Sequence, residues 1–318
     1  MNFHNDKSTF RFMIFKIAEK NKVREEILEK DYYVTLLLKE LSEKENQSYA
    51  YFKGGTALYK ALKSIRRFSE DIDLTVYVND LPNNSQKQKR LKEIVKGFNS
   101  LEFKEKLVDR RGSIEVSYSY DSVFDNNMED ILQRYGIVKI EATSFTVSEP
   151  ITYLEIAPHL YELASDEEKL ILESEYNVKP FKIGVNTLER IFLDKVFASE
   201  NYFINQKFTD FTKHIYDITV MMKLNQIENF LNDLPSLLNI LELKKYEESV
   251  RIGGLDYNIN ISEFRYINNS DFYYSMNFRK TLKYIHALYV FNEADYNTID
   301  EIVEALNSLL SIFENYNL

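Results

Sequence analysis

Residues 51–78 read YFKGGTALYKALKSIRRFSEDIDLTVYV and carry most of the information about fold class. The short run before Gly54 predicts a strand, and the paired glycines indicate a turn. Apolar residues at helical spacing follow from Thr56 to Lys63, and a second strand is predicted over 72–78. This order of strand, glycine turn, helix and strand predicts an α/β core.

The same stretch brings two kinds of phosphate chemistry together. At Gly54 and Gly55 the missing side chains let backbone amides approach a phosphate, and the helix that opens at Thr56 points its first amides the same way. Asp71 and Asp73 stand at i and i+2 on the second predicted strand, so both carboxylates project from one face. Two carboxylates on one rigid element suit Mg²⁺, with Mn²⁺ as the alternative ion. Each feature alone is typical of turns or solvated strands, but the combination predicts a nucleotide site.

The run from GGTAL to RFSEDIDL resembles the AbiEii nucleotidyltransferase-like toxins of type IV toxin-antitoxin systems. The segment LEKDYYVTLLL around Asp31 is similar to the family's lead-in helix, and the resemblance covers most of residues 27–222. It implies the DNA-polymerase-beta-like nucleotidyltransferase fold, a mixed sheet core with helices, and Mg²⁺-dependent transfer from a nucleoside triphosphate (NTP). Thr56 represents the family's Ser or Thr after the glycines.

The resemblance also implies three further site residues. The strand GIVKIEATSF offers Glu141 as a third metal ligand or as the base, with a surface charge paired to Lys139 as the alternative. TLERIFLDKVFA resembles the family's helix with a functional lysine, here Lys195, whose place on the apolar stripe predicts an inward ammonium that binds nucleotide phosphates. An ammonium that reaches water from the stripe's edge is the alternative. KHIYDITVM nominates Asp217 as catalytic, and a structural aspartate that fixes Lys195 or Lys213 is the alternative.

The sequence predicts three parts. Residues 1–47 form N-terminal helices that pack on the core, and residues 48–185 form the nucleotidyltransferase α/β core. Residues 186–318 form a mainly helical C-terminal domain that contributes Lys195 and Asp217. The other expected elements are helices over 8–20, 24–42, 187–199, 208–222, 226–243 and 298–315, strands over 49–53, 113–120 and 137–145, and a turn with a short strand over 253–261.

Composition limits the partners and the chemistry. The formal net charge of -10 argues against binding of nucleic acid by bulk electrostatics. Local basic clusters remain, namely Lys60, Lys63, Arg66 and Arg67, and Lys87, Lys89, Arg90, Lys92 and Lys96. The absence of cysteine excludes thiolate zinc sites and cysteine nucleophiles, and four scattered histidines form no cluster that would make His214 a ligand. No apolar stretch approaches the length of a membrane span, and no signal-peptide pattern opens the chain, so we expect a cytoplasmic protein.

The expected function is therefore a toxin-type nucleotidyltransferase. The resemblance implies an RNA acceptor, and the 3′ end of tRNA is the first candidate. It also implies growth arrest or phage defence as the outcome and a cognate antitoxin protein as a partner. One alternative keeps the enzyme class but moves the nucleotide to a protein or a small molecule. The other is a non-catalytic NTP-binding module.

Overall fold

The computed structural model describes residues 2–44, 49–124, 135–146, 148–251, 253–256 and 258–318. The chain forms two compact units. Unit 1 consists of Met1–Ala61 and Ser69–Val185, and unit 2 consists of Leu62–Phe68 and Asn186–Leu318. The short segment Leu62–Phe68 thus belongs to unit 2 although both of its neighbours in sequence belong to unit 1.

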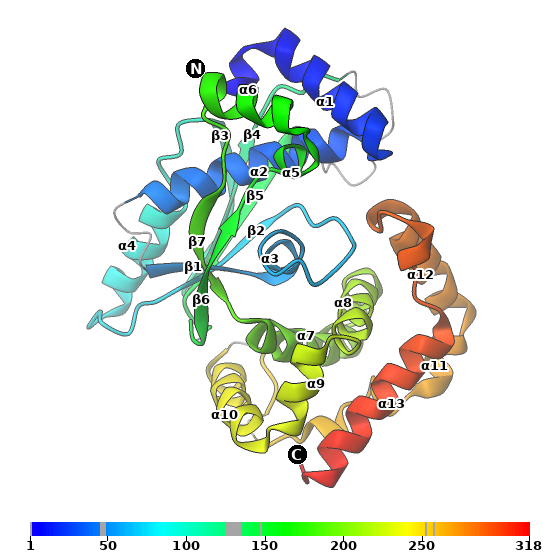
Figure 1. Cartoon of the computed structure of the whole chain (residues 1–318). Coiled ribbons are helices and arrows are strands. Elements are labelled where there is room, and N and C mark those ends of the chain that lie inside the picture. Colours follow the sequence, from blue (N-terminus) through cyan, green and yellow to red (C-terminus); the bar gives the residue numbers. More distant parts are fainter. Residues whose placement is uncertain (1, 45–48, 125–134, 147, 252, 257) are drawn as a thin grey trace. The chain divides into compact units, whose positions relative to one another are not determined.

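Unit 1 contains a seven-stranded mixed sheet in the order β3-β4-β5-β2-β1-β7-β6 (Figure 1). β1 and β2 are antiparallel, as are β3 with β4 and β4 with β5, whereas β2 runs parallel to β5 and β1 parallel to β7. This mixed sheet confirms the predicted α/β class. The strands are β1 (Ala50–Lys53), β2 (Ile72–Val76), β3 (Glu102–Arg110), β4 (Ser113–Ser119), β5 (Ile137–Thr143), β6 (Ile151–Ile156) and β7 (Phe181–Asn186).

The helices of unit 1 cover this sheet. α2 packs against β5, α3 packs against β1 and β2, and α4 packs against β4 and β5. α6 begins with a capping box, in which Ser165 and Glu168 satisfy each other's backbone amides. The helices are α1 (Lys7–Asn21), α2 (Glu25–Glu43), α3 (Gly54–Lys60), α4 (Asn84–Ile94), α5 (His159–Leu163) and α6 (Asp166–Tyr176).

Unit 2 is helical, with α8 packed against α7, α12 and α13. The helix expected over 226–243 is divided at Asp233, whose side chain accepts a hydrogen bond from the amide of Ser236 and so caps α10. The helices are α7 (Leu188–Ile204), α8 (Phe208–Met221), α9 (Asn225–Asn232), α10 (Leu234–Val250), α11 (Ser270–Tyr274), α12 (Met276–Tyr289) and α13 (Ile299–Asn315).

The prediction of a short strand over 256–261 is wrong for the described residues of this segment. The side chain of Asp256 accepts a hydrogen bond from the amide of Asn258 at 2.8 Å, and the Asp256 carbonyl accepts one from Ile259 at 3.2 Å. Such local bonds compete with strand pairing. The chain then enters the 3₁₀ helix Ile261–Glu263.

Within the described ranges of the chain, no helix is both long and apolar enough to cross a membrane.

Candidate functional site

A row of charged side chains crosses the middle of the sheet in unit 1. Lys53 on β1 lies opposite Asp73 on β2, Asp73 lies opposite Glu141 on β5, and Glu141 lies opposite Glu115 on β4. Residues directly opposite each other on neighbouring strands share one face of a sheet. The structure therefore places Glu141 beside Asp73, and it adds Lys53 and Glu115, which the sequence patterns did not single out.

The glycine turn lies directly against this row. Gly54 has φ +76°, a left-handed conformation that favours glycine, and a β-carbon built there would lie 2.1 Å from Oδ2 of Asp73. β1 ends at Lys53, and α3 starts at Gly54 with Gly55 buried in its first turn (Figure 1). The backbone of the turn and the carboxylate of Asp73 are thus in contact, with no side chain between them.

Asp71 is tied to the same turn through Thr56. The Thr56 hydroxyl donates a hydrogen bond to the backbone carbonyl of Asp71 at 2.5 Å and lies 3.0 Å from the hydroxyl of Ser69. Thr56 is fully buried, whereas Asp71 is exposed and lies one residue before β2 begins. The hydroxyl of Thr56 therefore fixes the backbone of Asp71 relative to the first turn of α3.

Negative charge accumulates around this row. The pKa of Glu115 is raised, first by burial and then by the negative charges of Glu141 and Asp71, while Lys139 and Arg110 act in the opposite direction. A nearby negative charge raises the pKa of a carboxyl group because it disfavours the ionised form. A bound cation would relieve this repulsion.

Two of these carboxylates could hold a magnesium ion if substrate phosphates supplied the remaining ligands. In the part of the chain that the structure describes, no group of three or more His, Cys, Asp or Glu is arranged to hold a metal by itself. Mg²⁺ commonly binds through one or two carboxylates together with water and substrate phosphates, so a complete protein cage is not required. Asp71 and Asp73 beside the glycine turn match that pattern, and Glu141 on the adjacent strand does not complete a group of three ligands among the described residues.

A buried ion pair anchors the C-terminal end of α3. Nζ of Lys60 lies 2.6 Å from Oδ1 of Asp31, and both side chains are almost fully buried. Asp31 also accepts a hydrogen bond from the amide of His159 at 2.6 Å, and Lys60 donates one to the carbonyl of Ala157 at 3.2 Å. Lys60 is therefore a structural residue, and its inclusion in a surface basic cluster was wrong.

A second group of predicted residues meets in unit 2. Lys195 on α7 lies 3.1 Å from Oδ2 of Asp217 on α8. Arg67, from the segment Leu62–Phe68, donates hydrogen bonds to both carboxylate oxygens of Asp217 at 2.7 and 2.6 Å. Burial alone would raise the pKa of Asp217, but Arg67 and then Lys195 outweigh it and hold the pKa below its ordinary value. Asp217 is thus an ionised, fully buried anchor for two cations.

His214 and Lys213 lie beside this ion cluster. The pKa of His214 is held well below its ordinary value by burial and then by the positive charges of Lys195, Arg67 and Lys213. Its buried Nδ1 has no hydrogen-bond partner in the described part of the chain. Lys213 is 3.9 Å from Asp210. The positive charges of Lys195, Arg67 and Lys213 thus keep the buried imidazole of His214 neutral.

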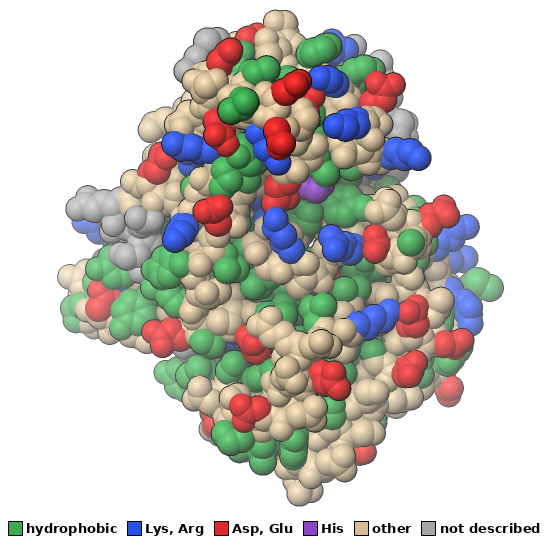
Figure 2. All heavy atoms as spheres, viewed as in Figure 1, with side chains coloured by type: hydrophobic (Ala, Val, Ile, Leu, Met, Phe, Trp, Pro, Cys, Tyr) green, Lys and Arg blue, Asp and Glu red, His purple; other side chains and the backbone are tan. Residues whose placement is uncertain are grey.

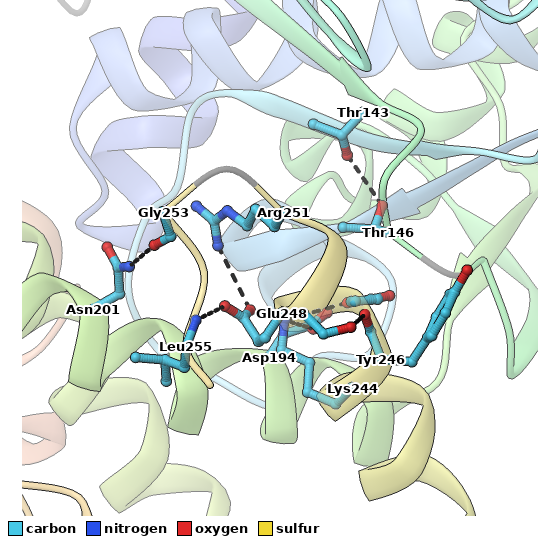
Figure 3. Close-up of polar contacts among 12 residues, drawn as sticks. Thr143, Thr146, Asp194, Asn201, Lys244, Tyr246, Glu248, Arg251, Gly253 and Leu255 are labelled. Carbon is cyan, nitrogen blue, oxygen red and sulfur yellow. Dashed lines mark hydrogen bonds and ion pairs between the residues drawn. The ribbon is translucent and has the colours of Figure 1, made fainter. Parts of the chain in front are cut away.

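A further buried ion network, absent from the sequence-based site, fixes α7 against α10. Lys244 pairs with Asp194 at 3.1 Å, with Glu248 at 2.8 Å and with Glu247 at 3.3 Å (Figure 3). Arg190 pairs with Asp194 at 3.2 Å and also with Glu247. Because Asp194 directly precedes Lys195, this network limits the movement of the helix that carries Lys195.

The predicted site residues thus fall into two groups, each assembled within one unit. In unit 1 the structure gathers Gly54, Gly55, Thr56, Asp71, Asp73 and Glu141. In unit 2 it gathers Lys195 and Asp217, and it adds Arg67 to them.

Comparisons with known proteins identify the family of the chain. No curated protein matches the chain. The family model described as "Nucleotidyl transferase AbiEii toxin, Type IV TA system" matches residues 36–266, which is well over half of the chain. That range includes the glycine turn, the carboxylate row and the Lys195 cluster. The chain therefore belongs to the AbiEii family of nucleotidyl transferase toxins of type IV toxin-antitoxin systems.

Proposed function

We propose that this toxin transfers a nucleoside monophosphate from an NTP to a hydroxyl group of an RNA acceptor, with the 3′ end of tRNA as the expected site. The observation that carries the proposal is the direct approach of the Asp73 carboxylate to the backbone of Gly54. A polyphosphate bound to the amides of this turn would lie next to the carboxylates, and a divalent cation between them would neutralise both negative groups.

Each residue of unit 1 has a separate task in this proposal. The backbone of Gly54 and Gly55 binds the distal phosphates. Asp71 and Asp73 hold Mg²⁺, with Glu141 as an additional ligand or as the base, and Thr56 positions Asp71 through its carbonyl. When bound, Mg²⁺ supplies Lewis acidity and neutralises the charge that develops on the phosphates.

The proposed transfer is an in-line displacement at the α-phosphorus of the NTP. The oxygen of the acceptor hydroxyl forms a bond to the α-phosphorus, and the bond from that phosphorus to the bridging oxygen of the β-phosphate breaks. Pyrophosphate leaves with the bonding electron pair, and Glu141 accepts the hydroxyl proton. The protein's contribution is to align these groups and to supply fixed charges around them.

In unit 2, Lys195 binds triphosphate oxygens in this proposal and Asp217 positions it. Asp217 is poorly suited to act as a base, because Arg67 and Lys195 already hold its carboxylate and lower its pKa. The family also implies an antitoxin partner. We expect the activity in the cytoplasm, where NTPs and tRNA are present.

The acceptor is tested with total bacterial RNA. Purified protein is incubated with Mg²⁺, the RNA and each α-labelled NTP in turn, and the RNA is then separated by size. We expect label in a tRNA-sized band with one preferred nucleotide. Label on a protein or a small molecule would replace the RNA acceptor, and nucleotide binding without any pyrophosphate release would indicate a non-catalytic module.

A further inference from the structure

The exposed side of α12 is basic along its length. Phe278, Leu282 and Ile285 face the interior, whereas Arg279, Lys280, Lys283 and Tyr284 face solvent at spacings of three to four residues. No Asp or Glu occurs anywhere between Asp271 and Glu293. We call Arg279, Lys280, Lys283 and Tyr284 the α12 basic face. Lys and Arg side chains gather at the right-hand edge of Figure 2, where α12 runs in Figure 1.

The cations of this face are not neutralised by neighbours. Within the part of the chain that the structure describes, Lys280 and Lys283 form no ion pair. Arg279 donates a hydrogen bond from Nε to the carbonyl of Tyr274 at 3.0 Å, which orients the guanidinium but leaves its charge unbalanced. These positive charges are therefore available to an external anion.

The two basic clusters that were noted in the sequence differ from the α12 basic face in their ion pairs. On α4, Lys89 lies 3.8 Å from Glu93, and Lys92 lies 3.3 Å from Asp109. Arg90 is held by both carboxylate oxygens of Asp80 at 2.6 and 2.8 Å. In the other cluster, Lys60 and Arg67 are buried in ion pairs with Asp31 and Asp217. Most cations of these clusters thus already have carboxylate partners.

Aromatic rings lie beside the free cations. Tyr284 is 39% exposed within the α12 basic face, and Tyr274, at the end of α11, is 45% exposed. Exposed tyrosine rings next to Lys and Arg are the combination that binds single-stranded nucleic acid, because the cations contact phosphates and the rings stack on bases. Because the protein carries a net charge of -10, most of its surface would repel phosphates. Such binding would therefore be restricted to this local surface.

The C-terminal end of α12 connects this face to the Lys195 cluster within the same unit. The amide of Phe68 donates a hydrogen bond to the carbonyl of Tyr289 at 2.7 Å, and the amide of Phe291 donates one to the carbonyl of Arg66 at 3.2 Å. Arg66 is exposed, and the adjacent Arg67 binds Asp217. A strand bound along α12 would therefore lead toward the proposed triphosphate-binding lysine.

We propose that the α12 basic face binds the acceptor RNA. Arg279, Lys280 and Lys283 contact phosphates of its backbone, and Tyr284 stacks on an unpaired base. This inference rests on the proposed function, because that proposal supplies the RNA. It adds the surface that holds the acceptor.

Two variants with equal changes of charge test the surface. The first is Arg279→Gln, Lys280→Gln and Lys283→Gln, and the control on α4 is Lys87→Gln, Lys89→Gln and Lys92→Gln. Each variant removes three of the positive charges in the sequence. Binding of the full-length proteins to fluorescent total tRNA is followed by anisotropy between about 50 and about 200 mM salt. Circular dichroism confirms that both variants are folded.

We expect the α12 variant to bind tRNA at least about tenfold more weakly than wild type and to lower the salt slope of log K by about 2. The α4 control should remain within about twofold. Equal affinity of wild type and the α12 variant would overturn the proposal. So would wild-type protein that binds vesicles containing phosphatidylserine but not RNA.

A transfer assay on the same proteins separates this inference from the proposed function. If wild type binds tRNA through α12 but transfers no nucleotide to it, the proposed function fails and the RNA surface stands. If wild type labels tRNA and the α12 variant labels it with an unchanged KM for tRNA, the surface fails and the proposed function stands. The expected result is a raised KM for tRNA with an unchanged KM for the NTP.

Discussion

Arg67 binds both carboxylate oxygens of Asp217, from Nε at 2.7 Å and from Nη2 at 2.6 Å, in an environment where neither side chain reaches solvent appreciably. The two residues are far apart in the sequence. Their pairing joins the segment Leu62–Phe68, which precedes the carboxylates of β2, to the helix that holds Lys195 in place. The same pairing holds the pKa of Asp217 below its ordinary value, which favours the role of an anchor over that of a proton acceptor.

Loss of Arg67 should therefore destabilise the protein strongly. The substitution Arg67→Gln leaves the buried charge of Asp217 with Lys195 as its remaining charged partner, and breaking a buried pair in this way costs about 3 to 5 kcal/mol. Urea unfolding followed by circular dichroism measures the loss. The matched control is Arg66→Gln at the exposed neighbouring position, which should change the free energy of unfolding by less than about 0.5 kcal/mol. Equal effects at both positions would show that the pair is not a stabilising anchor.

Substitution of Gly54 should disturb the carboxylate row and not only the turn. Gly54→Ala places a β-carbon 2.1 Å from Oδ2 of Asp73 in a left-handed conformation. Gly97→Ala is the control, because Gly97 has φ +72° but no atom within 4 Å of the added carbon. Both variants should lose about 1 to 2 kcal/mol of stability from backbone strain. Only Gly54→Ala should also lower kcat, by about 10²-fold or more, because Asp73 is displaced. Comparable kcat values in the two variants would argue against the contact with Asp73.

The pH dependence of stability should report the buried imidazole of His214. Its folded-state pKa lies well below the ordinary value of 6.5, so below that pH the unfolded chain binds a proton that the folded protein does not. The stabilising contribution is thus complete above pH 6.5 and is lost as the pH falls, by about 1.4 kcal/mol per pH unit. Unfolding in urea is compared for wild type and His214→Gln between about pH 7.5 and about pH 5.5. A difference between the two proteins that stays constant over this range would contradict a neutral His214.

The hydroxyl of Thr56 should matter through Asp71. Thr56→Val keeps the shape of the side chain but removes the hydrogen bond to the Asp71 carbonyl, whereas Thr56→Ser retains a hydroxyl. We expect Thr56→Val to lower kcat by about 10- to 100-fold and to raise the Mg²⁺ concentration needed for half-maximal rate, as for residues that orient metal ligands. Thr56→Ser should recover most of the activity. If the valine variant had the same Mg²⁺ dependence as wild type, Thr56 would not position Asp71.

The sequence predicts β1, β2, β4 and β5 of the sheet because their signals are local. The order of strand, glycine turn, helix and strand is visible in residues 51–78, and the structure contains each of these elements. Helix ends are also signalled locally, as at Thr298, which caps α13 through a capping box with Glu301. The strands β3, β6 and β7 were missed. Both faces of β3 are exposed, so its charged sequence shows no alternation of apolar and polar residues.

The long-range electrostatic pairs could not be read from the sequence. Lys60 and Arg67 look like members of an exposed basic run, yet each is buried against a carboxylate distant in sequence. Glu115 sits in an ordinary alternating strand and joins the site only through its register with Glu141. Such partners depend on which strands and helices become neighbours, which composition and periodicity do not specify. The α12 basic face was missed for a related reason, because only the structure shows which cations lack partners.

The proposed mechanism requires the carboxylate of Asp73 for nucleotidyl transfer. The most direct test measures pyrophosphate release and labelling of RNA for wild type, Asp73→Asn and Asp80→Asn, with Mg²⁺ and the preferred NTP. Asp80 is an exposed aspartate beyond the end of β2 that pairs with Arg90, so its variant controls for the loss of a nearby charge. We predict that Asp80→Asn retains wild-type activity, whereas a folded Asp73→Asn protein loses at least about 10²-fold in kcat. Pyrophosphate release by Asp73→Asn at the wild-type rate would contradict the account.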